Sequence, residues 1–324
     1  MNQVASMALA LAMLPCAAHA EPSPGERDLD PRRAALLEEL REEPVACELD
    51  LPYAATGNPR QRLDLYLPKS RAREKLPVLV FFHGGAWRHG DKSDGAGWLM
   101  PLLRTGQYAG VSAGYRLSGE ATWPAQIHDA KAAIRWVRAN ASRYGLDAER
   151  IGVWGPSAGG HLVLMLGASG DVPELEGDVG EHVGVSSKVA AVANVFGVAE
   201  LLAMIGPPSD FDRTRADAPE ALLLGGPLRE NPDKAKAASP LTYVSPGDPP
   251  VLTVHGTADR TVPYDQAVRL DAALRAAGVP SYFVRVEGAG HGDLGSAADD
   301  RVAAFFARYL LGERAPVSTA PIQP

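Results

Sequence analysis

The chain has 324 residues and a formal net charge of −7 at pH 7, and 46% of its residues are hydrophobic and 22% charged. These proportions are those of a globular protein and exclude a disordered or fibrous chain. The acidic balance, with no long basic run, excludes nucleic acid as a partner and leaves no polybasic segment for an anionic membrane surface.

The N-terminus has the pattern of a secretion signal. The first twenty residues carry no charged side chain, and the apolar run at 4–14 is too short to span a bilayer. An A-H-A motif at 18–20 stands just before Glu21, where a signal peptidase would cut. The sequence therefore predicts a signal peptide at 1–20, a secreted or periplasmic protein and no integral membrane segment after cleavage; the alternative is an ordinary N-terminal helix. Cleavage would leave Cys47 as the only cysteine, so no internal disulfide is expected.

The remaining chain divides into three parts. Residues 21–44, rich in charge and proline, predict an N-terminal arm that packs on the domain and holds a short helix. Residues 45–312 predict one domain, and 313–324 predict a flexible tail. Within the domain, apolar runs, most of them with valine, predict strands at 63–67, 78–82, 109–114, 151–154, 189–196, 251–255 and 282–286. Helical patterns predict helices at 125–139, 158–166, 265–277 and 299–311.

The alternation of these elements decides the fold class. Several of the strand runs lack polar alternation, as strands do when helices cover both faces of a parallel sheet. We therefore expect an α/β fold with a mostly parallel central sheet and helices on both faces. Insertions near 170–187 and 198–246 interrupt the alternation, the second with a helical piece at 219–224. Long loops after strands are usually functional, so we expect a small cap or lid there.

One serine stands in a sharp turn between a predicted strand and a predicted helix. It is Ser157, in the sequence G-P-S-A-G at 155–159, which matches the G-x-S-x-G pattern. The flanking glycines remove side chains that would collide in such a turn, so Ser157 would project above the sheet edge. The following helix directs its first N–H groups to the same place, which makes Ala158 a candidate oxyanion donor. The alternative is a serine N-cap on a glycine-rich turn.

A serine hydroxyl attacks a carbonyl only when a base takes its proton and a third group orients that base. Asp259 and His291 each follow a predicted strand, and His291 lies between glycines. The order serine, acid, histidine from successive strand ends predicts Ser157 as nucleophile, Asp259 as orienting acid and His291 as base. The structural alternatives are a turn aspartate paired with Arg260 and a surface loop histidine.

The segment F-F-H-G-G-A-W at 81–87 ends a predicted strand with two glycines. Glycines let backbone N–H groups approach a carbonyl oxygen closely, so Gly85 and Ala86 are further candidate oxyanion donors. His83 is expected to brace this loop by hydrogen bonds. Trp87 is a candidate to line the substrate pocket, with core packing as the alternative.

Together these motifs resemble those of a known family. The sequences H-G-G-A-W-R-H-G-D-K at 83–92, G-P-S-A-G-G-H-L at 155–162 and G-A-G-H at 288–291 are similar to those of α/β-hydrolases of the esterase and lipase group with an HGG(G/A) oxyanion loop. Within that group the chain resembles bacterial feruloyl and acetylxylan-type carbohydrate esterases, over roughly residues 51–311. The resemblance implies the α/β-hydrolase fold, a cofactor-free serine esterase with the triad and oxyanion donors named above, and a small-molecule or polysaccharide-linked ester as substrate.

Other functions remain open at this point. The same triad would serve an aryl formamidase or other amide hydrolase, or a small exopeptidase, and a non-catalytic binding protein is the alternative from another class. Asp129 is expected to anchor structure through Arg135 or a nearby loop, and His161 and His255 to pack or to form hydrogen bonds. No H-E-x-x-H motif, paired cysteines or carboxylate cluster at ligand spacing is present, so no metal is expected.

Overall fold

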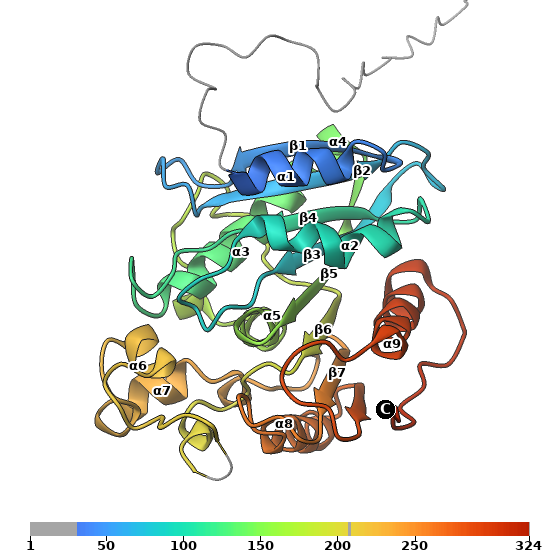
Figure 1. The fold of residues 1–324 in the computed structure, drawn as a ribbon. Helices are drawn as coiled ribbons and strands as arrows, with labels where there is room; N and C mark the ends of the chain where they lie inside the picture. Colours follow the sequence, from blue (N-terminus) through green and yellow to red (C-terminus); the bar gives the residue numbers. More distant parts are fainter. Residues whose placement is uncertain (1–30, 207–208, 324) are drawn as a thin grey trace, which may run out of the picture.

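The computed structural model describes residues 31–206 and 209–323. The expected signal peptide at 1–20 and the arm residues 21–30 therefore lie outside the described residues. The strands are β1 (Val45–Pro52), β2 (Arg62–Pro68), β3 (Leu76–Phe82), β4 (Ala109–Ala113), β5 (Leu146–Pro156), β6 (Ala191–Val195), β7 (Val251–Gly256) and β8 (Ser281–Val286). They form one eight-stranded sheet in the order β1-β2-β4-β3-β5-β6-β7-β8 (Figure 1).

The sheet is mostly parallel, as the sequence predicts. β1 pairs with β2 and β2 with β4 in antiparallel fashion, and the pairs from β4 to β8 are parallel. Every residue of β3, β4, β6 and β7 is buried, as in strands that helices cover on both faces. The carboxyl ends of the parallel strands consequently meet at one edge of the sheet, where open α/β sheets place their sites.

Helices cover both faces of this sheet. They are α1 (Pro31–Leu40), α2 (Gly95–Leu103), α3 (Ala125–Ala139), α4 (Ala141–Tyr144), α5 (Ala158–Ala168), α6 (Pro219–Leu224), α7 (Pro232–Ala237), α8 (Asp265–Ala276) and α9 (Ser296–Phe306). Alternate residues of β3 point to opposite sides: Val78 and Val80 join the cluster under α3, α5 and α8, while Leu79 and Phe81 join the cluster under α1, α2 and α9. In the described residues, no helix has the length and apolar character needed to cross a bilayer.

The predicted strands are confirmed as β2 to β8, but β1 and α2 are missing from the sequence prediction. β1 reads V-A-C-E-L-D-L-P and is partly exposed along most of its length, so it carries neither a continuous apolar run nor a clean alternation. α2 reads G-A-G-W-L-M-P-L-L, and its two glycines and one proline lower its intrinsic helix propensity. In both elements, packing on the domain outweighs the local signal.

The C-terminal tail differs from the flexible segment that the sequence predicts. Val317 and Ile322 are buried in the apolar cluster under α9. The N–H of Glu287 donates to the carbonyl of Ile322, whose own N–H donates to the carbonyl of Arg285, both at 2.9 Å. Because two apolar side chains reach the core, the tail lies along β8 and covers the edge of the sheet.

Both insertions pack on the domain. In 170–187, Glu176 accepts hydrogen bonds from Lys131 Nζ at 2.6 Å and Arg135 Nη1 at 3.0 Å, and these two α3 side chains are 0% and 1% exposed. In 198–246, α6 and α7 form an apolar cluster with the loop that follows β3 and with the first residue of α5. The second insertion therefore touches two segments that surround Ser157.

Candidate active site

Ser157 lies in a strained turn between β5 and α5. Its φ of +54° and ψ of −120° are unfavourable for a residue with a side chain, and its N–H donates to the carbonyl of Val195 at 2.9 Å. The flanking glycines are required because the turn has no room for side chains. A Cβ at Gly159 would lie 2.0 Å from the carbonyl oxygen of Phe82, and one at Gly155 would lie 2.7 Å from that same oxygen. This is the sharp strand-to-helix turn that the G-x-S-x-G pattern predicts.

Three polar side chains from separate strand ends meet at this turn. His291, in the loop after β8, places Nε2 3.1 Å from Ser157 Oγ. Its Nδ1 lies 2.8 Å from Oδ2 of Asp259, in the loop after β7. The ring of Phe196 packs against the imidazole, with ring centroids 4.4 Å apart. The structure thus joins Ser157, His291 and Asp259 in one hydrogen-bonded line.

The carboxylate of Asp259 is buried and fully surrounded by donors. Its Oδ1 accepts hydrogen bonds from the N–H groups of Thr261 and Val262, both at 2.9 Å. Its Oδ2 faces His291 Nδ1 and also His255 Nε2, at 3.3 Å. Burial raises the pKa of Asp259, but the hydrogen bonds from His255, His291 and the backbone outweigh it and hold the pKa well below its usual range. Asp259 is therefore an anion, and sequence reasoning missed its contact with His255.

The loop after β3 comes close to Ser157 with an unusual backbone. Gly85, Ala86 and Trp87 have φ values of +104°, +53° and +57°. Gly85 and Ala86 border the same cavity as Ser157. Ala158 is the first residue of α5, so its N–H has no acceptor within the helix. Residues from two segments thus lie beside Ser157, and the role of Gly85, Ala86 and Ala158 as oxyanion donors stays a prediction.

Trp87 does not line the cavity that Ser157 borders, so of its two expected roles the pocket lining is wrong and the core packing is confirmed. Its side chain is 2% exposed, and its Nε1 donates to His161 Nδ1 at 3.2 Å. The indole packs in the cluster that α6 and α7 form, where it finds both apolar neighbours and a hydrogen-bond acceptor. The aromatic residues that do line the cavity are Trp98, Trp154, Phe196 and Phe211.

Two other histidines near the site have the structural roles expected of them. His83 Nδ1 lies 2.7 Å from the carbonyl oxygen of Gly84, and its ring stacks on Tyr115 with centroids 4.3 Å apart. His161 is fully buried between Trp87 and the carbonyl of Ala238. Burial lowers the pKa of each imidazole to about 4, so both rings are neutral at pH 7 and neither is placed as a second base.

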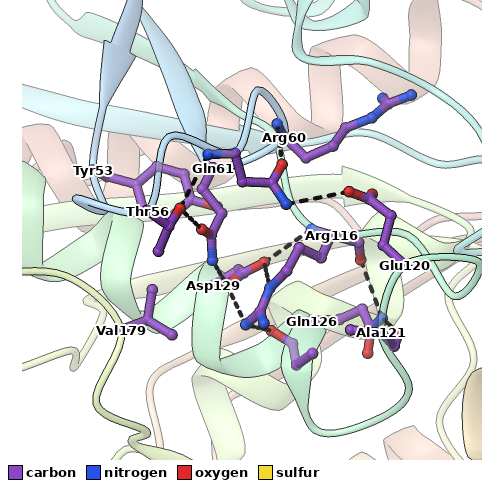
Figure 2. A network of polar contacts seen from close by, with 12 residues as sticks. Tyr53, Thr56, Arg60, Gln61, Arg116, Glu120, Ala121, Gln126, Asp129 and Val179 are labelled. Atoms are coloured by element: carbon purple, nitrogen blue, oxygen red, sulfur yellow. Dashed lines mark hydrogen bonds and ion pairs between the residues drawn. The ribbon is translucent and has the colours of Figure 1, made fainter.

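Asp129 anchors the loop that follows β4 (Figure 2). Its carboxylate accepts hydrogen bonds from the Arg116 backbone N–H at 2.9 Å, Arg116 Nε at 2.8 Å and Gln61 Nε2 at 2.7 Å. The predicted loop anchor is confirmed, but the predicted partner Arg135 is wrong. Residues six positions apart lie on different sides of a helix, and Arg135 pairs with Glu176 instead.

A cavity of about 1150 Å³ contains Ser157 and His291 in its wall. One part of it, called here the α2–α9 arm, is lined by Gly97, Trp98, Pro101, Leu102, Val302 and Ala303, with the polar residues Thr105, Asp299 and Asp300 beside them. Another part reaches the 198–246 insertion at Phe211 and Arg213. Among the residues that the structure describes, no group of three or more histidine, cysteine or acidic side chains is arranged to hold a metal ion.

A serine, a histidine and an aspartate joined at the carboxyl edge of a mostly parallel, helix-covered sheet define an α/β-hydrolase with a Ser-His-Asp arrangement. Comparison with known families agrees with this class. The chain belongs to the BD-FAE family, whose model matches residues 63–274.

Named proteins that this chain is similar to include esterases. The chain is 32% identical to Esterase LipC of Mycobacterium tuberculosis over 237 residues, which cover 72% of this chain but only 57% of LipC. Among solved structures, a truncated form of a carbohydrate esterase from gut microbiota is similar with a TM-score of 0.77 and 33% identity, over 83% of this chain and 98% of that one. A bifunctional GH43-CE protein of Bacteroides eggerthii is similar with a TM-score of 0.76 and 36% identity, over 82% of this chain and 35% of that one.

Proposed function

We propose that this protein hydrolyses carboxylic esters through an acyl-enzyme formed on Ser157. The observation that carries the proposal is the line from Ser157 Oγ through His291 to Asp259, with distances of 3.1 Å and 2.8 Å. A hydroxyl within hydrogen-bond reach of an imidazole, itself oriented by a buried carboxylate, is the arrangement that activates serine as a nucleophile. The esterase names of the relatives support ester rather than amide chemistry.

In the first half of the reaction, Ser157 Oγ attacks the carbonyl carbon of the ester while His291 Nε2 takes the hydroxyl proton. Asp259 keeps the other imidazole proton on Nδ1 and stabilises the imidazolium. The negative charge on the former carbonyl oxygen is stabilised by the N–H groups of Gly85, Ala86 and Ala158. The carbon–oxygen bond to the alcohol then breaks, and His291 gives its proton to the leaving alcohol.

In the second half, water replaces the alcohol beside His291. The imidazole takes a proton from this water as its oxygen attacks the acyl carbon. The bond to Ser157 Oγ breaks, the serine regains its proton from His291, and the carboxylic acid leaves. The same three side chains therefore serve both halves without a cofactor.

The structural neighbours named as carbohydrate esterases suggest an ester of a carbohydrate, and we propose acetyl or feruloyl esters of plant polysaccharide as the substrates. Of these two acyl groups, the α2–α9 arm favours the larger. An acetyl group needs only a small space next to Ser157, whereas the same cavity also borders the apolar residues of this arm, Trp98 among them, with Asp299 and Asp300 of α9 beside them. Such walls suit a flat aromatic group. We therefore place feruloyl-type esters ahead of acetyl esters as the substrate class.

Replacement of the nucleophile tests the proposal. Ser157→Ala is expected to lower kcat for 4-nitrophenyl acetate by a factor on the order of 10⁶, with an unchanged melting temperature. A fluorophosphonate should form a covalent adduct at Ser157 in the native protein and none in the variant. Ser142→Ala, at an exposed helical position, is the matched control and should keep both turnover and labelling. Turnover retained by Ser157→Ala would reject the proposal.

A further inference from the structure

His255 is a buried, titratable side chain that the proposed reaction does not use. It stands near the end of β7, four residues before Asp259, and is 0% exposed. Its Nε2 lies 2.9 Å from the carbonyl oxygen of Val262 and 3.3 Å from Asp259 Oδ2. Its Nδ1 is also buried and has no hydrogen-bond partner among the described residues. All polar contacts of this ring therefore go to the loop that carries Asp259.

These contacts fix which ring nitrogen of His255 donates. Two acceptors, the carbonyl of Val262 and the carboxylate of Asp259, face Nε2, and none among the described residues faces Nδ1, so an N–H on Nε2 satisfies the most hydrogen bonds. This N–H of His255 is thus shared between the Val262 carbonyl and the Asp259 carboxylate.

The shared hydrogen bond completes the coordination of Asp259. Backbone N–H groups of Thr261 and Val262 hold Oδ1, while His291 and His255 both face Oδ2. Without His255, only His291 among the described residues would face Oδ2, and fewer contacts would fix the plane of the carboxylate. His255 also ties Val262, one of the residues that hold Oδ1, to β7.

We infer that His255 is a positioning residue for the triad: it fixes the carboxylate oxygen that orients His291 toward Ser157. This inference rests on the proposed function, since it assigns His255 a role in the same reaction. It predicts that His255 acts on the rate only through Asp259. A purely packing role, against the rings of Phe196 and Tyr264, predicts a loss that does not depend on Asp259.

Substitutions that separate the donor from the bulk of the ring provide the test. His255→Leu keeps an apolar side chain but removes the N–H, and His255→Gln places an amide N–H near the position of Nε2. A misplacement of about 1 Å costs up to about 10²-fold in rate, and two backbone donors still hold Oδ1. We therefore expect His255→Leu to lower kcat about tenfold with KM within about twofold, and His255→Gln to recover most of that loss.

A double-mutant cycle with Asp259→Asn gives the decisive readout. If His255 acts through the carboxylate, His255→Leu changes kcat less than about twofold in the Asp259→Asn background. His161→Leu removes another fully buried histidine and is the matched control, because its effect should be the same in both backgrounds. An equal loss from His255→Leu in both backgrounds, or a wild-type kcat for His255→Leu, would overturn the inference.

A second pair of variants covers the case in which His255→Leu does not fold. His255→Asn has the same amide as His255→Gln but ends one bond short of the Nε2 position. The inference predicts an about tenfold lower kcat for the asparagine variant than for the glutamine variant, and equal rates would overturn it. If Ser157→Ala still turns over the ester, the proposed function is rejected. If Ser157→Ala is inactive but His255→Leu lowers kcat equally with and without Asp259→Asn, only this inference is rejected.

Discussion

The backbone of Ser157 is strained, and its neighbours hold it in that state. A positive φ at a residue with a side chain costs on the order of 1–3 kcal/mol. The Ser157 N–H donates to the carbonyl of Val195, and its carbonyl accepts from the N–H of His161 in α5, so strand and helix both anchor the turn. This strained backbone places Ser157 Oγ 3.1 Å from His291 Nε2. At the scale of single residues, the nucleophile therefore depends on small neighbours as much as on polar ones.

Gly159→Ala tests this dependence. The added Cβ would lie 2.0 Å from the carbonyl oxygen of Phe82 and 2.8 Å from that of His83, and backbone atoms cannot turn away as a side chain can. We expect a loss of about 1–3 kcal/mol in the free energy of unfolding and at least a roughly 100-fold loss of kcat. Urea unfolding and turnover of 4-nitrophenyl acetate measure the two effects. Gly184→Ala, where a Cβ meets nothing within 4 Å, should change neither, and native kcat in Gly159→Ala would contradict the argument.

At the scale of elements, α2 shows how residues that weaken a helix shape the cavity. Gly95 allows close packing on the sheet, because a Cβ there would lie 2.2 Å from Ser112 Oγ. Gly97 lines the cavity, and a Cβ there would meet nothing within 4 Å. Gly95 and Gly97 lower the helix propensity of α2, which is why the sequence does not predict this helix. The same two glycines let the helix pack on β4 and leave space in the α2–α9 arm.

Filling the α2–α9 arm should change acyl preference. Gly97→Phe places a ring in open space, so it should narrow the arm without a clash in the core. We expect at least an about tenfold lower kcat/KM for 4-nitrophenyl ferulate, and a change within about threefold for 4-nitrophenyl acetate, which has the same leaving group. Gly184→Phe, equally open but outside the cavity, serves as the control. Equal losses for both esters would show that the arm does not receive the acyl group.

The 170–187 insertion depends on one carboxylate. Glu176 faces Lys131 and Arg135, both buried, and burial already lowers the pKa of these two cations. Glu176→Ala would leave both charges without their acid, so we expect a loss of about 3 kcal/mol in the free energy of unfolding. Asp171→Ala removes an exposed partner of Lys188 and should cost no more than about 0.5 kcal/mol. A comparable urea midpoint for the two variants would contradict this difference.

At the scale of the whole molecule, local sequence patterns predict the strands of the sheet. Contacts between residues distant in sequence decide where Trp87 and the C-terminal tail lie. The apolar runs locate β2 to β8, and their ends locate Ser157, Asp259 and His291 before any coordinates are known. The position of Trp87 could not be predicted, because the insertion that buries it returns more than a hundred residues later. The same holds for the tail, which reaches β8 only after α9. His255 stands four residues before Asp259, so the sequence suggests that the two are close. Only the folded turn between them shows that the imidazole faces the carboxylate.

The buried histidines make the stability of the whole domain sensitive to acid. Burial lowers the pKa of His83 and of His161 from the usual 6.5 to about 4, so between these values the unfolded chain binds protons that the folded chain does not. Stability then rises with pH in this window and falls as the pH drops from 6.5 toward 4. At pH 5 the loss relative to pH 7.5 is about 2 kcal/mol for each ring.

Urea unfolding at pH 7.5 and pH 5.0 measures this loss, and His161→Gln isolates one of the two contributions. His161 faces the indole of Trp87 and the carbonyl of Ala238, neither of which titrates in this range, so the substitution removes one titration and leaves that of His83. The variant is expected to be less stable at pH 7.5, because the glutamine loses part of the packing and hydrogen bonding. Its stability difference between the two pH values should nevertheless be about 2 kcal/mol smaller than that of the native protein. An unchanged difference would mean that His161 is not held neutral by burial.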